Sequence, residues 1–328
     1  MNIPPDASSN FDITSLASSV GVAQVASPIA DLTYRNYDGP LKTRAVRWWI
    51  VALAGLRQAF RKPGFWISVV LCALPCLIFG LLLYIQKVSG QMPPRAADAD
   101  PRFATTFFQV IQIQGLFIFI IALTVGAGCI AADNSANALL VYLSKPLTKS
   151  DYLLGKWMAI FLLLFGAIAI PNLLLYVFCL LMFFKDGFLS EEPLLLGRIL
   201  LAAAVPAILY ASLLLGISAW SKTARAVGGI MAVLYFMSLI LSGFLVSIFY
   251  NVSKEPSDKV LLAASASLSG LISGLIQHIF GVTSRTAGRG MTWGSPPLMP
   301  LLIVFTMLVV VGIGAARMKV RAVEVVRG

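Results

Sequence analysis

Residues 157–184 read WMAIFLLLFGAIAIPNLLLYVFCLLMFF, a run without a charged side chain. As an α-helix this run is long enough to cross the hydrocarbon core of a bilayer, which is roughly 30 Å thick. Similar uncharged runs occupy residues 64–85, about 105–132, 199–221, about 226–250 and 298–316. The sequence therefore predicts an all-α, polytopic membrane protein with six transmembrane helices.

The composition of the whole chain supports this prediction. Of 328 residues, 59% are hydrophobic and 12% are charged, and the mean hydropathy is +0.87. The formal net charge is +11, but the basic residues lie between the apolar runs rather than on a soluble domain, so nucleic acid is excluded as a partner. One histidine and four cysteines offer little material for a metal site or a disulfide framework, and we expect neither.

The N-terminal region divides into two parts. Residues 1–30 are rich in small and polar residues and lack the pattern of a signal peptide, which predicts a disordered cytoplasmic tail. Residues 31–63 are predicted to be a cytoplasmic lead-in followed by an amphipathic helix in the headgroup plane. That helix has an apolar centre too short to span a bilayer, flanked by Trp48, Trp49, Arg57 and Arg61. A helical extension of the first span is the alternative.

A seventh apolar run, VLLAASASLSGLISGLIQ at residues 260–277, is rich in Ser, Ala and Gly and inserts only weakly. Six spans with a cytoplasmic N-terminus leave most Lys and Arg in the cytoplasm, whereas a seventh span would distribute them more evenly. We therefore predict a re-entrant outer helix at about 259–281 between spans five and six. The six-span transmembrane domain then covers 64–316, and a basic tail at 317–328 follows. Both termini are expected to be cytoplasmic, in a multi-pass protein of the cytoplasmic (inner) membrane.

The predicted spans contain no Asp, Glu, Lys or Arg in their interiors. Ion-coupled transporters and voltage sensors usually carry such residues, so both classes are disfavoured. The chain also lacks a G-x-x-x-x-G-K-[ST] phosphate loop, because the fragment Gly155-Lys156-Trp157 has neither the upstream glycine nor the following hydroxyl residue. Any uphill transport would need ATP hydrolysis in another polypeptide.

Three amides stand out in the second span: Gln109, Gln112 and Gln114. Amides at one membrane depth either bond neighbouring helices together or face a translocation pathway. The sequence leaves both alternatives open.

The loop between the second and third spans, residues 133–156, has its own pattern. An N-cap at Asp133, Asn134 or Ser135 is followed by leucines at helical spacing, and Pro146 ends the pattern. A second N-cap at Thr148 or Ser150 begins the next helix. The loop is therefore predicted to hold a short amphipathic cytoplasmic helix between two spans, suited to receiving force from a soluble partner; a loop lying on the membrane is the alternative.

At this loop the sequence resembles the membrane permease subunit of ATP-binding cassette (ABC) transporters of the type-2 exporter class. Asp133 followed by LLVYLSKPLTKSDYLLGK, from Leu139 to Lys156, is similar to the coupling-helix segment of that family. The resemblance extends over nearly the whole chain after Asp31, through the basic interfacial helix, the six spans and the re-entrant segment.

The resemblance implies a nonenzymatic exporter subunit that uses ATP hydrolysed by a separate nucleotide-binding ATPase subunit. ATP and Mg would be bound by that partner, and no cofactor by this chain. The residues implied to contact the ATPase subunit are Asn137, Leu139, Leu140, Tyr142, Leu143 and Lys145. A membrane scaffold without transport, or an ion-independent facilitator, remains the alternative function.

The resemblance also implies a second permease chain, as a homodimer or a heterodimer. Small residues allow close approach of helices, either at the seam, meaning the contact between two permease chains, or within one chain. The candidates are Gly126, Gly128, Gly228, Gly229 and Gly243.

Overall fold

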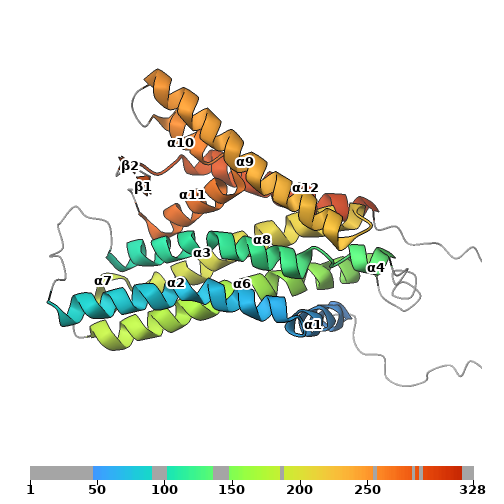
Figure 1. Cartoon of the computed structure of the whole chain (residues 1–328), viewed down its shortest axis with the longest axis horizontal. Helices are drawn as coiled ribbons and strands as arrows, with labels where there is room; N and C mark the ends of the chain where they lie inside the picture. The colour runs from blue at the N-terminus through green and yellow to red at the C-terminus, as the bar shows by residue number, and fades with distance from the viewer. Residues whose placement is uncertain are drawn as a thin grey trace, which may run out of the picture. The chain divides into compact units, whose positions relative to one another are not determined.

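The computed structural model describes residues 47–90, 102–135, 148–184, 188–253, 257–282, 285–287 and 291–319. Within these residues the chain is almost entirely helical (Figure 1). Six helices are long and apolar enough to cross a membrane, which confirms the predicted fold class. They are α2 (Pro63–Val88), α3 (Arg102–Gly126), α6 (Lys149–Phe183), α8 (Leu195–Trp220), α9 (Ala224–Ser253) and α12 (Leu298–Lys319).

The weak seventh run forms two short helices, α10 (Asp258–Ala264) and α11 (Leu268–Phe280), bent by 118° at the break between them. The Ser267 hydroxyl accepts a hydrogen bond from the Gly270 N–H and so caps α11. A bent pair of this kind fits either a re-entrant segment or a broken span. The sequence did not predict the small antiparallel hairpin that follows, formed by β1 (Arg285–Ala287) and β2 (Met291–Trp293).

The remaining short helices are α1 (Arg47–Phe60), α4 (Ala131–Ser135) and α7 (Phe188–Glu191). Helix α1 is separate from α2, because Lys62 is extended and Pro63 begins the next helix. The Trp66 indole donates to the Phe60 carbonyl across this break, at 3.0 Å. The structure therefore does not contain the continuous helical extension considered as the alternative for this segment.

Prolines lie inside three of the long helices, and neighbouring groups compensate for at least one of them. Pro171 in α6 has no N–H, so the carbonyl of Ala167 loses its usual helical donor. The Cys72 thiol of α2 donates to that carbonyl at 3.8 Å. This contact joins two spans through a backbone group that the proline leaves available.

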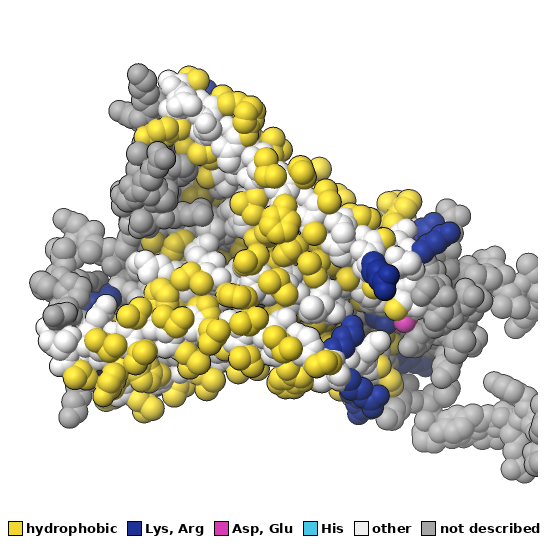
Figure 2. Space-filling model, viewed as in Figure 1, with side chains coloured by type: hydrophobic (Ala, Val, Ile, Leu, Met, Phe, Trp, Pro, Cys, Tyr) yellow, Lys and Arg dark blue, Asp and Glu magenta, His cyan; other side chains and the backbone are white. Residues whose placement is uncertain are grey.

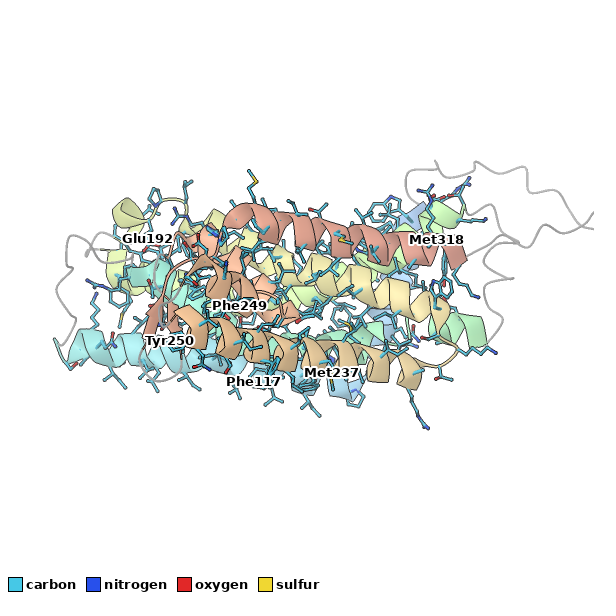
Figure 3. The ribbon with its side chains drawn as sticks, turned by 90° about the horizontal axis from the view of Figure 1, so that it is seen from above. Phe117, Glu192, Met237, Phe249, Tyr250 and Met318 are labelled. Atoms are coloured by element: carbon cyan, nitrogen blue, oxygen red, sulfur yellow. The ribbon has the colours of Figure 1, made fainter. Side chains whose placement is uncertain are left out.

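Helix α8 is the centre of the packing. It contacts α3, α6, α11 and α12. Of the residues in its apolar stretch 67% are buried, compared with 11% in α9. Its crossing with α12 depends on glycine, since a Cβ on Gly216 would lie 2.6 Å from the Gly312 carbonyl oxygen. Glu192 and Met318 mark the two opposite ends of the helices (Figure 3).

Candidate functional site

The residues expected to contact an ATPase subunit all fall between α4 and α6, outside the described residues: Asn137, Leu139, Leu140, Tyr142, Leu143 and Lys145. The structure does describe both ends of this segment. On one side α4 ends at Ser135, and on the other α6 begins at Lys149. The candidate site is therefore built from the residues that hold these two ends.

A buried ionic cluster joins the two ends. The Lys156 ammonium lies 2.7 Å from Asp133 Oδ2, and the Tyr152 hydroxyl donates to the same oxygen at 2.7 Å. The side chains of Lys156 and Asp133 are only 10% and 18% exposed, and Tyr152 is fully buried. Low exposure to water strengthens the attraction between the ammonium and the carboxylate. It also makes either charge costly without its partner, so the loss of one side chain destabilises the others. We call Asp133, Tyr152 and Lys156 the Asp133 clamp.

Helix α8 holds the turn that leads into α4. The Ser218 hydroxyl accepts hydrogen bonds from the backbone N–H groups of Ile130 and Ala131, at 3.0 and 2.9 Å. Both N–H groups are at the start of α4, where a helix offers no acceptor of its own. Ser218 therefore fixes the segment before Asp133 to the central helix of the fold.

The start of α6 has the predicted cap. Thr148 is the N-cap residue, and its hydroxyl accepts from the Asp151 N–H at 3.2 Å. The Asp151 carboxylate in turn accepts from the Thr148 N–H at 3.3 Å, which completes a capping box. Of the two candidates from the sequence, Thr148 is confirmed.

Helix α1 packs directly on the first turns of α6. A Cβ on Gly155 would lie 2.6 Å from both the Trp48 carbonyl oxygen and the Val51 Cβ. Val51 is buried, as is Ala52, whereas Trp49 is 41% exposed. Part of the apolar face of α1 is thus covered by protein, while Arg57 and the neighbouring Arg61 are exposed on the protein surface. Its placement in the headgroup plane stays a prediction.

Basic side chains gather at the end of the helices where α4 lies (Figure 2). The described cations there come from α1, α6, α9 and α12 and from the breaks after α1 and α8, and only two described carboxylates, Asp133 and Asp151, accompany them. The cations are Arg47, Arg57, Arg61, Lys62, Lys149, Lys156, Lys222, Arg225, Arg317 and Lys319. We call this the basic end.

The three glutamines of α3 have different surroundings. Gln114 is fully buried; its amide donates to the Cys72 carbonyl at 2.9 Å and accepts from the Asn172 amide at 2.9 Å. It therefore bonds α2, α3 and α6 together. Gln112 donates to the Ser273 hydroxyl of α11 at 2.6 Å and lines a small pocket of about 180 Å³, whereas Gln109 is exposed. A pathway-facing role for these residues stays a prediction.

The sequence indicates Asp133 as an N-cap candidate at the start of the segment that resembles a coupling helix and Lys156 as the end of that segment, but it does not single out Tyr152 or Ser218. One signal was present: Asp133 directly follows an apolar run and Lys156 directly precedes another. Opposite charges at the same ends of two adjacent spans lie at the same depth and can pair. No comparable signal marks Ser218, which is one of two serines in the apolar helix α8.

Comparison with known proteins agrees with this architecture. The family model described as ABC-2 family transporter protein matches residues 49–319, from α1 to the last residue of α12. No curated protein matches the chain. Because the family model covers most of the chain, including every candidate span and both ends of the clamped segment, the protein belongs to the ABC-2 family of transporter membrane proteins.

Proposed function

We propose that the chain is the transmembrane permease subunit of an ABC exporter, which moves a substrate out across the cytoplasmic membrane with ATP hydrolysed by a separate subunit. The family match over residues 49–319 carries this proposal. Permeases of this family lack an ATPase domain and generally pair with ATPase subunits. ATP and Mg are then bound by the partner.

The basic end faces the cytoplasm in this proposal, since Lys and Arg accumulate on that side of membrane proteins. The ATPase subunit docks there on residues 137–145. Three anchors support a coupling role for the segment: the Asp133 clamp ties its two ends together, Ser218 ties it to α8, and the capping box stiffens the start of α6. A displacement of the segment is then passed to α3, α6 and α8 as a rigid unit rather than absorbed by a flexible loop.

A second permease chain completes the translocation pathway, and we place the seam at α9. In this chain α9 is little buried, and a Cβ on Gly228, Gly229 or Gly243 would meet nothing within 4 Å. By contrast, a Cβ on Gly126 would lie 2.5 Å from Leu214 Cδ1, so that glycine serves packing within the chain. The free face of α9 therefore offers three small residues to a partner helix.

The test is to purify the tagged full chain from its native membranes in a mild detergent, identify co-purifying proteins by mass spectrometry, and measure ATPase activity and vesicle transport. We expect an ATPase subunit. Leu140→Asp is expected to uncouple ATP hydrolysis from transport, and Leu140→Met is the matched control that keeps an apolar side chain.

Three results would contradict the proposal. Repeated purification without any ATPase subunit argues against a permease. Uptake by the chain alone, without nucleotide, favours a facilitator. A complex with an active ATPase that moves nothing in vesicles favours a scaffold.

A further inference from the structure

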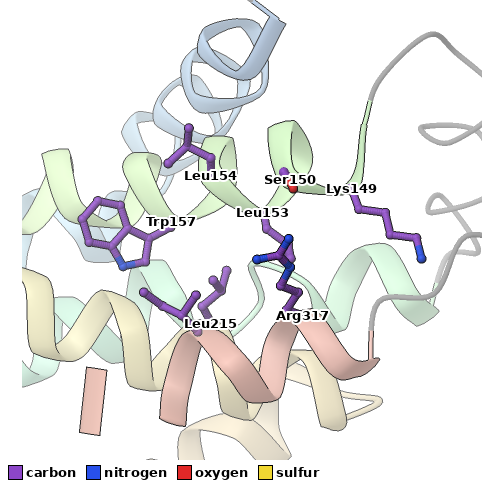
Figure 4. Close-up of a pocket in the computed structure, with 8 residues that line it drawn as sticks. Lys149, Ser150, Leu153, Leu154, Trp157, Leu215 and Arg317 are labelled. Carbon is purple, nitrogen blue, oxygen red and sulfur yellow. The ribbon is translucent and has the colours of Figure 1, made fainter. Parts of the chain in front are cut away.

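A groove of about 540 Å³ opens at the basic end between α6, α8 and α12. Its walls are mainly apolar, formed by Leu153, Leu154, Trp157, Leu215 and Ile313, and its polar rim is formed by Lys149, Ser150 and Arg317. In Figure 4 the Arg317 guanidinium projects toward Leu153 and Ser150, while Lys149 extends outward at the edge. The groove therefore combines a cationic mouth with an apolar interior.

The two cations of the mouth are not neutralised by the described part of the chain. Neither Lys149 nor Arg317 forms an ion pair with a described carboxylate. The nearest acidic side chain along α6, Asp151, is bonded to Thr148 in the capping box. The only other described carboxylate at this end, Asp133, is paired with Lys156. The mouth thus keeps its positive charge.

The apolar interior continues in the direction of the spans. Leu153 and Trp157 lie one helical turn apart on α6, and the Trp157 indole is fixed by donating to the Ser212 hydroxyl at 3.0 Å. The Trp157 ring stacks on Phe161 with centroids 5.2 Å apart, and Phe161 stacks on Phe165. An apolar chain lying along this side of α6 would pass from the charged mouth toward the membrane interior.

We propose that this groove binds an anionic phospholipid. Its phosphate lies between Arg317 and Lys149, where the guanidinium supplies paired donors, and one acyl chain lies against Trp157 and Ile313. A soluble acidic protein would match the mouth but leave the apolar walls uncovered, and a neutral lipid would match the walls but leave two cations without an anion. An amphipathic ligand with an anionic head satisfies both. The proposal is independent of the exporter function.

The test uses the full chain in detergent and native mass spectrometry with phosphatidylglycerol and phosphatidylcholine added in equal amounts. We expect retention of phosphatidylglycerol in preference to phosphatidylcholine. Arg317→Ala and Lys149→Ala are each expected to weaken phosphatidylglycerol binding by roughly fivefold, from the usual contribution of one cation near an anionic lipid surface. Arg225→Ala is the matched control, because it removes an exposed cation at the same end but outside the groove. It should leave phosphatidylglycerol binding unchanged.

A second variant distinguishes lipid binding in the groove from nonspecific attraction to surface cations and from a loss of folding. Ile313→Trp keeps both cations but fills the apolar part, so it should also weaken phosphatidylglycerol binding at an unchanged melting temperature. Equal retention of the two lipids, an equal loss in the Arg225→Ala control, or full binding by Ile313→Trp would each overturn the proposal. Competition by inorganic phosphate alone would also overturn it, because the site would then recognise the anion without the lipid.

Discussion

The Lys156 ammonium and the Asp133 carboxylate lie 2.7 Å apart, across the segment that separates α4 from α6. Both side chains are nearly buried, and Tyr152 closes the cluster from the same face of α6 as Lys156, four residues earlier. The pair therefore sets the distance between the two ends of residues 136–147. It does so at the end of the protein where an ATPase subunit is proposed to dock.

The first prediction concerns this pair. Replacing Lys156 by Met leaves the Asp133 carboxylate buried without its cation, which is expected to lower the free energy of unfolding by about 3–5 kcal/mol. Tyr152→Phe removes one hydrogen bond to a charged group and should cost less, about 1.5–3 kcal/mol. Thermal or denaturant unfolding in detergent measures both changes.

The double variant Asp133→Lys with Lys156→Asp is the control for the interaction itself. It restores opposite charges at the two positions and is expected to recover part of the stability lost in either single exchange. If the double variant is only as stable as the sum of the single losses predicts, the two residues are not energetically coupled.

The sequence predicted the spans because each is a long uncharged run. In hydrocarbon such a run forms an α-helix, since a helix satisfies its backbone N–H and C=O groups within the segment. It also offered Thr148 as one of two N-cap candidates, with Ser150 as the other, because capping depends on residues close together along the chain. The clamp required a contact between separate helices, 23 residues apart from Asp133 to Lys156. Periodicity and composition do not specify which neighbours a span meets, so Ser218 and the bonds of Gln114 emerged only from the packed structure.

The second prediction concerns the crossing of α1 and α6. Gly155→Ala places a methyl group 2.6 Å from the Trp48 carbonyl and from Val51, so α1 must shift, at a cost of about 1–3 kcal/mol. Gly166→Ala in the same helix is the matched control, since its Cβ would meet Ile170 only at an ordinary 3.8 Å. Hydrogen exchange should show faster exchange in α1 for the first variant and no change for the second. Equal exchange in both variants would mean that α1 is not held by this contact.

The third prediction separates the two interpretations of the α3 amides. Gln114→Leu removes the hydrogen bonds to Cys72 and Asn172 and leaves the buried Asn172 amide with one bond fewer. Hydrogen bonds between membrane helices contribute about 0.6 kcal/mol on average, so a loss of about 1–2 kcal/mol is expected for the whole set. Gln109→Leu, at an exposed position of the same helix, should leave the unfolding free energy unchanged. A transport defect from Gln114→Leu at unchanged stability would instead favour a pathway-facing role.

The fourth prediction concerns the seam at α9. Gly229 and Gly243 lie about four helical turns apart and therefore on nearly the same face, which also carries the exposed Phe236. If α9 meets a second permease chain there, Gly229→Cys or Gly243→Cys should form a disulfide across the seam when membranes are oxidised, since a disulfide requires Cα atoms within about 7 Å. Non-reducing gel electrophoresis reads out the linked species.

The control for α9 is Val310→Cys on α12, a helix that is equally little buried and 62% exposed at this position. A lipid-facing cysteine diffuses past others and links only slowly, whereas a cysteine near a two-fold axis is held against its own copy. A linked species of twice the chain mass indicates a homodimer with its seam at α9. For a heterodimer, a matching cysteine must also be placed in the other permease, and a linked species with the summed mass of the two chains then supports the seam. Efficient linking through Val310→Cys with none through α9 would move the partner surface to α12, because both helices expose apolar faces and only the contact itself distinguishes lipid from protein.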